Sequence, residues 1–231
     1  MFFRYKIHFP SLGVYDNLNY LGFDIDDDIG GLDIYPNRNS NQKIELKIVG
    51  VSFHSPSEHI IDGKQFPVEM QVIHTVVNSK GKEINSSKVI ISVFWAESNE
   101  TNPEIDSFNL KDHKSFKRFY MNELLGKIAS EGYLYEGSLT IPDCSKATWI
   151  LLSKPLNVSK IQILDVQFSR NNSYRVLQNS ENRTIYKLQI KSSIQGEYYS
   201  VYFVIGLASL FVIMFYFGMI THRNKEKQLL L

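Results

Sequence analysis

The sequence is poor in cysteine and balanced in charge. Its 231 residues include a single cysteine, Cys144, so no disulfide can form within the chain, and the simplest interpretation of Cys144 is a small core residue. Lys and Arg number 25 against 24 for Asp and Glu, and these charges are not gathered into the basic face that phosphate binding requires. A nucleic-acid partner is therefore not expected. The opening MFFRYKIHFP contains charged residues and lacks the apolar core of a signal peptide.

One long hydrophobic run is present. Residues 201–220 read VYFVIGLASLFVIMFYFGMI without a charge, and a helix of that length spans a hydrocarbon core of about 30 Å. Tyrosines precede the run and HRNKEKQ follows it, which predicts a single-pass type I membrane protein. Its parts would be an extracellular or lumenal domain at 1–195, a linker at 196–200 and a cytoplasmic tail at 221–231. The alternative is a buried C-terminal helix, but a core helix of this length usually keeps a polar face.

Export of the domain raises the question of its N-terminus. Either the start of the chain is missing, or the membrane segment itself directs export. Sequons of the form Asn-x-Ser/Thr agree with an exported glycoprotein; they stand at Asn85, Asn99, Asn157, Asn171 and Asn182.

Between these ends the pattern predicts mostly strands. Stretches rich in Val and Ile alternate with turn residues, which favours strands at 43–53, 67–77, 88–96, 148–159 and 166–169. Turns are expected at Asp62-Gly63, Ser79-Lys80-Gly81 and Asn102-Pro103. A weak helical pattern is present only at 112–129. The acidic stretch GFDIDDDIGGLD (22–33) is expected to be a loop that is either solvated or cation-binding. The chain is thus predicted to form an all-β or α+β domain.

The segment VSFHSPSEH (51–59) raises the possibility of a metal site. On an extended strand Ser52 and His54 share a face, and a hairpin would bring Gln71 of the next long strand beside them. A catalytic zinc site on adjacent strands uses three imidazoles and leaves a fourth position open for water. Only His54 supplies an imidazole here.

These residues and two later motifs resemble the α-carbonic anhydrase family. Ser52-Phe53-His54, Glu58-His59 and Glu69-Met70-Gln71 are similar to the family's His-x-His, Glu-His and Glu-x-His. YEGSLTIPDCSKATWILLSKPLNVS (135–159) is similar to its YxGSLTTPPC…TWIV segment, and SYRVLQNSENRTI (173–185) to NxRPxQxLNxR. The resemblance runs from about Lys43 to Ile185. It implies a mostly β fold with a central twisted, largely antiparallel sheet and few short helices, here followed by one transmembrane helix.

The resemblance also implies that the zinc site is degenerate. His54 is the one ligand kept, while Ser52 and Gln71 stand where the family has histidine. Zinc favours imidazole, thiolate or carboxylate over a hydroxyl or an amide, so no cofactor is expected. Without zinc nothing brings the pKa of a bound water down to about 7.

Other family residues are retained. By resemblance, Thr140 and Glu58 are a gatekeeper pair, Glu69 and His59 support the ligands from outside, and an apolar pocket is formed by Ile73, Ile90, Leu139 and Trp149. These residues also build core and hydrogen bonds, which is the alternative reason for their presence. A new site made by His54, His59, His74 and Glu69 is disfavoured, because alternation puts His74 on the face opposite Gln71.

The resemblance bears on the N-terminus as well. In exported members the cysteine corresponding to Cys144 pairs with one near the start of the domain, and this sequence has no such partner. Ser52 also lies earlier than its equivalent in a full domain. We therefore expect the opening strands and the proton-shuttle histidine to be missing, and Asn182 to occupy a buried position without a glycan.

Two functions are compatible with these features. The preferred one is a catalytically inactive, carbonic anhydrase-related ectodomain on one membrane span that binds an unknown protein or glycan ligand. The alternative is a membrane-bound carbonate dehydratase that uses zinc for the reversible hydration of CO₂. Ser52 and Gln71 favour the first.

Overall fold

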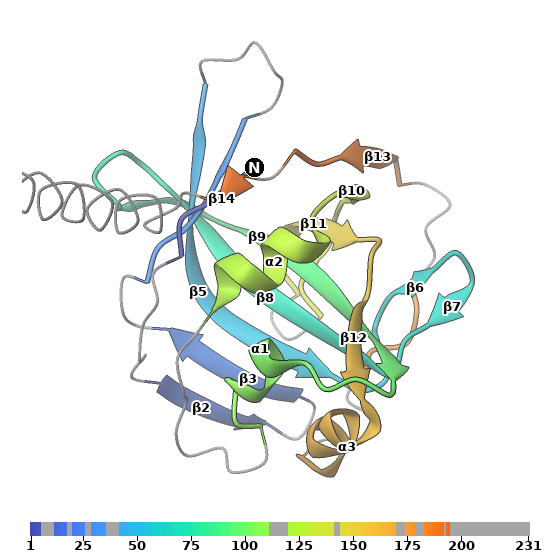
Figure 1. Ribbon diagram of the computed structural model, residues 1–231. Helices are drawn as coiled ribbons and strands as arrows, with labels where there is room; N and C mark the ends of the chain where they lie inside the picture. The colour runs from blue at the N-terminus through green and yellow to red at the C-terminus, as the bar shows by residue number, and fades with distance from the viewer. Residues whose placement is uncertain are drawn as a thin grey trace, which may run out of the picture. The chain divides into compact units, whose positions relative to one another are not determined.

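Most of the described chain is β-strand (Figure 1). The structure is a computed structural model that describes residues 1–5, 12–17, 20–25, 29–35, 42–110, 120–140, 144–169, 174–178, 183–191 and 193–194. In chain order the elements are β1 (Phe2–Phe3), β2 (Leu12–Asn17), β3 (Tyr20–Ile25), β4 (Gly31–Ile34), β5 (Ile44–His54), β6 (Ile60–Ile61), β7 (Lys64–Gln65), β8 (Val68–Val77), β9 (Glu83–Ser98), α1 (Pro103–Asp106), α2 (Met121–Ile128), β10 (Glu131–Ser138), β11 (Lys146–Leu152), β12 (Leu156–Ser159), α3 (Lys160–Ser169), β13 (Ile185–Gln189) and β14 (Ser193–Ile194).

One mixed sheet of 12 strands organises the described residues. Its order is β13-β10-β11-β9-β8-β5-β4-β1-β14, with β3 beside β5, β2 beside β3 and β12 beside β9. Most neighbours are antiparallel, but β9 is parallel to β11 and β12, and β1 is parallel to β14. The short strands β6 and β7 form a separate hairpin between β5 and β8.

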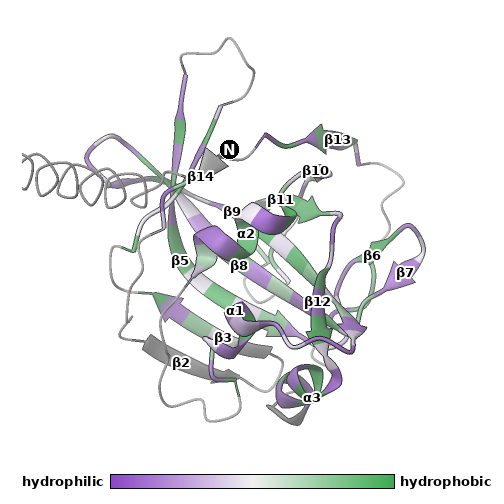
Figure 2. Cartoon of the chain, viewed as in Figure 1, coloured by the Kyte–Doolittle hydropathy of each residue, from purple (hydrophilic) through white to green (hydrophobic). Residues whose placement is uncertain are grey.

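The central strands β5, β8 and β9 are covered on both faces. Hydrophobic and hydrophilic residues alternate along parts of β5 and β8 (Figure 2), whereas β9 is hydrophobic from Val89 to Trp95 except at Ser92. One face carries the main core, in which Trp95 and Phe108 both pack edge-on against Phe53 and residues of α1 and α2 close the layer. A smaller cluster around Phe94 and Trp149 lies on the other face. Polar side chains on that second face of β8 are therefore buried and need hydrogen-bond partners.

The three long predicted strands are confirmed as β5, β8 and β9, but two later predictions need correction. The stretch 148–159 is broken before Leu156, next to Pro155, into β11 and β12. The predicted strand at 166–169 is wrong, because these residues end helix α3. Ile163 and Val166 are buried at helical spacing, and Ser159 and Gln162 exchange side-chain to backbone hydrogen bonds, the Ser-x-x-Gln box that starts a helix.

The expectations for the acidic stretch, the helix and the turn have different outcomes. Residues 22–33 are not one loop, since β3 and β4 occupy most of the described part and Asp33 is buried in an ion pair with Arg4 at 2.8 Å. Of the predicted helix at 112–129, α2 is the described helical part. The Asp62-Gly63 turn is confirmed: it joins β6 to β7 with φ values of 50° and 76°, and glycine adopts the second without strain.

No helix within the described ranges is long and apolar enough to cross a bilayer. The predicted linker at 196–200, span at 201–220 and tail at 221–231 lie outside those ranges. They remain predictions.

The buried His74 gives a prediction for acid stability. Its Nε2 lies 2.6 Å from the Tyr5 hydroxyl and its Nδ1 lies 3.2 Å from the Val89 carbonyl oxygen, and burial lowers the pKa of His74 to about 4. The unfolded chain binds this proton first as the pH falls below 6.5. The free energy of unfolding should therefore decrease towards pH 4, with His74 contributing at most about 3 kcal/mol.

Urea unfolding at several pH values between 6.5 and 4.5 measures this loss. His74→Gln keeps a donor and an acceptor but cannot be protonated, so the variant should lose less stability over that interval than the wild type. Equal losses would contradict the assignment.

Candidate functional site

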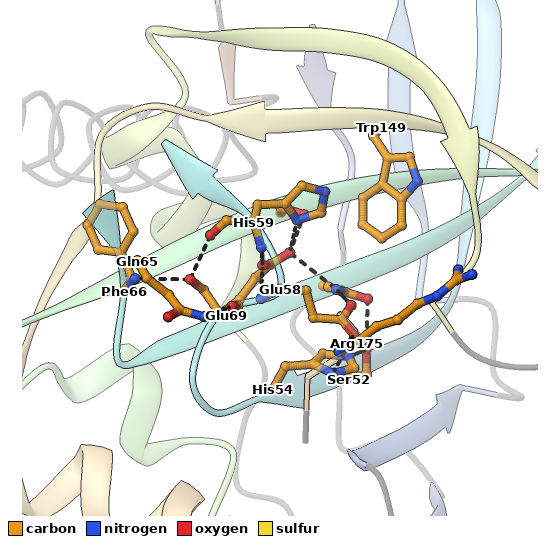
Figure 3. Close-up of polar contacts among 12 residues, drawn as sticks. Ser52, His54, Glu58, His59, Gln65, Phe66, Glu69, Trp149 and Arg175 are labelled. Carbon is orange, nitrogen blue, oxygen red and sulfur yellow. Dashed lines mark hydrogen bonds and ion pairs between the residues drawn. The ribbon is translucent and has the colours of Figure 1, made fainter. Parts of the chain in front are cut away.

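Three polar side chains meet on the face of β5 and β8 that lies opposite the main core. The strands pair antiparallel, with Ser52 opposite Gln71 and His54 opposite Glu69. Ser52, His54 and Gln71 are all buried. The Ser52 Oγ lies 3.3 Å from His54 Nε2 and 3.5 Å from Gln71 Oε1 (Figure 3). The convergence expected from strand alternation is therefore present.

This donor set does not fit zinc. It consists of one imidazole, one hydroxyl and one carboxamide, whereas zinc prefers nitrogen, thiolate or carboxylate ligands. Gln71 Nε2 already donates to Glu58 Oε2 at 2.8 Å and to Glu69 Oε1 at 3.2 Å. In the described part of the chain, no three His, Cys, Asp or Glu side chains are grouped as a metal ion would require. The side chains at this position satisfy one another instead.

The carboxylate of Glu69 is the centre of the surrounding network. Its Oε2 accepts hydrogen bonds from the backbone N–H groups of Glu58 and His59, both at 3.0 Å. Its Oε1 lies 2.8 Å from His59 Nδ1 and accepts from the Ser92 hydroxyl at 2.8 Å. With the Gln71 amide, five donors surround one fully buried carboxylate, which ties the turn after β5 to β8 and β9.

The charges of Glu69 and His59 support each other. Burial alone raises the pKa of the Glu69 carboxyl, but the charge of His59, its hydrogen bond, His54 and the Ser92 hydroxyl together lower it to about 2. Burial lowers the pKa of His59, and the charge and hydrogen bond of Glu69, with Glu58, outweigh burial and raise it. Each residue thus favours the charged form of the other.

Glu58 and Thr140, the predicted gatekeeper pair, line the same cavity of about 450 Å³. Glu58 Oε1 accepts from the backbone N–H of Arg175 at 3.1 Å and lies 3.5 Å from His54 Nδ1. Figure 3 shows Glu58 between Arg175 and the Glu69 network. The hydrogen bond from Gln71 Nε2 to Glu58 Oε2 therefore holds the Glu58 side chain and also links β8 to the turn after β5.

A second cavity, of about 250 Å³, borders Ser52 and Gln71. Ile73, Ile90, Leu139 and Thr140 line it, so three of the four predicted apolar residues come together there. Trp149 is not part of that lining. Its ring lies 4.9 Å from the ring of His59, and its Nε1 donates to the Ser138 carbonyl oxygen at 3.1 Å. Trp149 thus supports the network from the neighbouring cluster.

Sequence reasoning missed the parts of the site that come from β3 and from the segment after α3. Asp24 lines the smaller cavity because β3 pairs with β5, placing Gly22 opposite Ser52. Arg175 reaches Glu58 although 117 positions separate them. The motif at 173–185 was the available signal for Arg175, but it did not indicate that Glu58 is the partner.

The remaining predicted residues are less closely connected to the site. Asn99 and Asn157 are exposed, whereas Asn171 and Asn182 lie outside the described ranges and Asn85 is described only as part of β9. Cys144 is exposed, so its assignment to the core is wrong. His74 is on the opposite face, hydrogen-bonded to Tyr5, and does not join a metal cluster.

Comparisons with known proteins point to one family. The family model described as eukaryotic-type carbonic anhydrase matches residues 37–189, a range that contains the three motifs. Dioscorin dioA3 of Dioscorea japonica is 27% identical over 171 residues, covering 67% of this chain and 59% of that protein. A carbonic anhydrase-related protein of Rattus norvegicus is 32% identical over 139 residues, covering 52% and 48%. The chain spans about half the length of the curated relatives it matches.

A solved structure resembles the fold. The α-carbonic anhydrase of Photobacterium profundum aligns with a TM-score of 0.60 and 21% identity, covering 78% of this chain and 79% of that one. An identity of 21% supports a shared fold but not a shared activity. The expected mostly β architecture with few helices is confirmed.

The Glu69 network predicts a large difference between two glutamates. Glu69→Gln would turn an amide N–H₂ towards donors and leave His59 without its counter-charge, so it should lower the free energy of unfolding by about 3 kcal/mol. Glu83→Gln is the matched control, because Glu83 is 46% exposed and pairs with Lys88 at the surface. Its expected cost is about 0.5 kcal/mol or less.

Urea unfolding at pH 7 compares the two variants. Equal losses would show that the buried carboxylate is not the centre of the network.

Proposed function

Because the chain belongs to the eukaryotic-type carbonic anhydrase family, we propose that it is a catalytically inactive member that acts by binding another molecule. The single observation that carries this proposal is the replacement of metal coordination by hydrogen bonds among Ser52, His54 and Gln71. Hydration of CO₂ in this family requires a hydroxide made available at neutral pH, and a site without zinc does not supply it.

Three features support inactivity over catalysis. The amide of Gln71 is fully engaged with Glu58, Glu69 and Ser52, so releasing its oxygen for a metal would break buried hydrogen bonds. Glu69 neutralises His59 and does not need a metal-bound partner. The likeness to a carbonic anhydrase-related protein is in keeping with this proposal.

The binding role is proposed for a domain outside the cytoplasm on a single membrane span. The apolar run at 201–220 and the cations that follow it support this arrangement. The exposed sequons at Asn99 and Asn157 support it further, since glycosylation of this kind occurs in the secretory pathway. The proposed partner is a protein or a glycan.

Zinc content tests the metal side of the proposal. The purified full-length chain should contain no stoichiometric zinc by mass spectrometry and should not accelerate CO₂ hydration in a stopped-flow assay. Ser52→His combined with Gln71→His places two imidazoles beside His54 on paired strands, and this double variant should bind about one zinc ion per chain.

Each single substitution serves as the control, because two imidazoles hold zinc far more weakly than three. One zinc per wild-type chain together with rapid hydration would overturn the proposal in favour of a membrane-bound carbonate dehydratase. A double variant without zinc would show that the three positions do not converge as described.

Glycan attachment tests the proposed location. Expressed in eukaryotic cells, the chain should lose apparent mass on treatment with an amidase that removes N-linked glycans. Asn99→Gln combined with Asn157→Gln should reduce this loss. A wild-type chain whose mobility is unaffected by the amidase would contradict an exported domain.

A further inference from the structure

The larger cavity, of about 450 Å³, has a lining of mixed character. It is bounded by the β6–β7 hairpin, by β10 and by the segment at 174–178, and its wall includes the apolar side chains of Ile61, Leu151 and Val176. Val176 is 78% exposed, so the cavity has an apolar mouth as well as an apolar wall. This size and composition are typical of sites for small organic ligands.

Two arginines line the same cavity. Within the described ranges, neither Arg175 nor Arg183 forms an ion pair. The Arg175 Nη1 makes one long hydrogen bond, 3.4 Å, to the Leu139 carbonyl oxygen, and its side chain extends away from Glu58 (Figure 3). The Arg183 guanidinium lies over the ring of Tyr135, 6.0 Å from its centroid. Most of their N–H donors therefore remain available at the cavity.

Tyr135 also lines the cavity. Its hydroxyl oxygen lies 2.7 Å from His59 Nε2. His59 Nδ1 lies 2.8 Å from Glu69 Oε1, so the ring of His59 links this hydroxyl to the buried carboxylate. Among the described residues the Tyr135 hydroxyl has no other hydrogen-bond partner. Burial raises the pKa of Tyr135, which keeps its proton in place.

The negative charges at the cavity are already engaged. Glu58 accepts hydrogen bonds from Gln71 and from the backbone of Arg175. Asp62 accepts from the Tyr133 hydroxyl at 3.3 Å at the exposed edge. The cavity thus offers donors and positive charge against apolar walls, which is complementary to an anion with an apolar body.

We propose that this cavity binds a small organic carboxylate with an apolar or aromatic body. Arg175 and Arg183 hold the carboxylate. The body of the ligand lies against Ile61, Leu151 and Val176. None of the three positions that correspond to zinc ligands takes part, so the proposal stands whether or not the chain binds zinc.

Isothermal titration calorimetry with indole-3-propionate, an aromatic carboxylate, tests the site. The full-length chain is used in phospholipid nanodiscs, with empty nanodiscs as the blank. Its neutral analogue, indole-3-propionamide, should bind at least about tenfold more weakly, because it lacks the charge that the guanidinium groups recognise.

Arg175→Gln and Arg183→Gln should each weaken carboxylate binding by about three- to tenfold and leave amide binding unchanged. Arg183 is exposed, so its variant tests the site even if Arg175→Gln folds poorly. Lys160→Gln removes an exposed positive charge from α3, which does not line the cavity, and should have no effect. No binding at millimolar concentration, equal affinity for acid and amide, or arginine variants that behave like Lys160→Gln would each overturn the proposal.

Discussion

The buried carboxylate of Glu69 ties the turn after β5 to strands β8 and β9. Removing a charge from water costs several kcal/mol unless donors and an opposite charge compensate. Here five donors do so, one of them the ring of His59, and they come from the turn after β5 and from β8 and β9. Because the turn is fixed by these contacts, Glu58 and His59 hold defined positions on either side. Both residues line the larger cavity.

The same network explains how a site with this frame exists without three imidazoles. A serine and a glutamine leave room where a metal would stand, and buried polar groups without partners are costly. Ser52 and Gln71 resolve this by bonding to each other, and the second Gln71 donor reaches Glu58. The outer residues then keep their places for reasons of stability. Their presence is accordingly no argument for catalysis.

The ring of His59 connects this network to the larger cavity, because its Nδ1 lies 2.8 Å from Glu69 and its Nε2 lies 2.7 Å from the Tyr135 hydroxyl. Tyr135 lines that cavity together with Arg175 and Arg183, whose guanidinium groups have donors to spare. The network around Glu69 thus reaches the polar lining of the cavity. The binding site that we propose lies beside the position that corresponds to the zinc site and not at it.

Strand alternation was enough to predict that Ser52, His54 and Gln71 converge, because side chains two residues apart share a face and the two strands are neighbours along the chain.

The local sequence pattern gave a wrong prediction at 166–169. It favoured a strand there, but the capping pair of Ser159 and Gln162 starts a helix that includes these residues. The prediction that Cys144 is a core residue was also wrong, because the exposure of this side chain depends on the surrounding fold.

The sequence alone determined the family motifs and the two missing imidazoles, since these are matters of residue identity and spacing. Only the tertiary structure decided that Arg175 meets Glu58 and that two arginines border one cavity, because those contacts join segments that no local period relates.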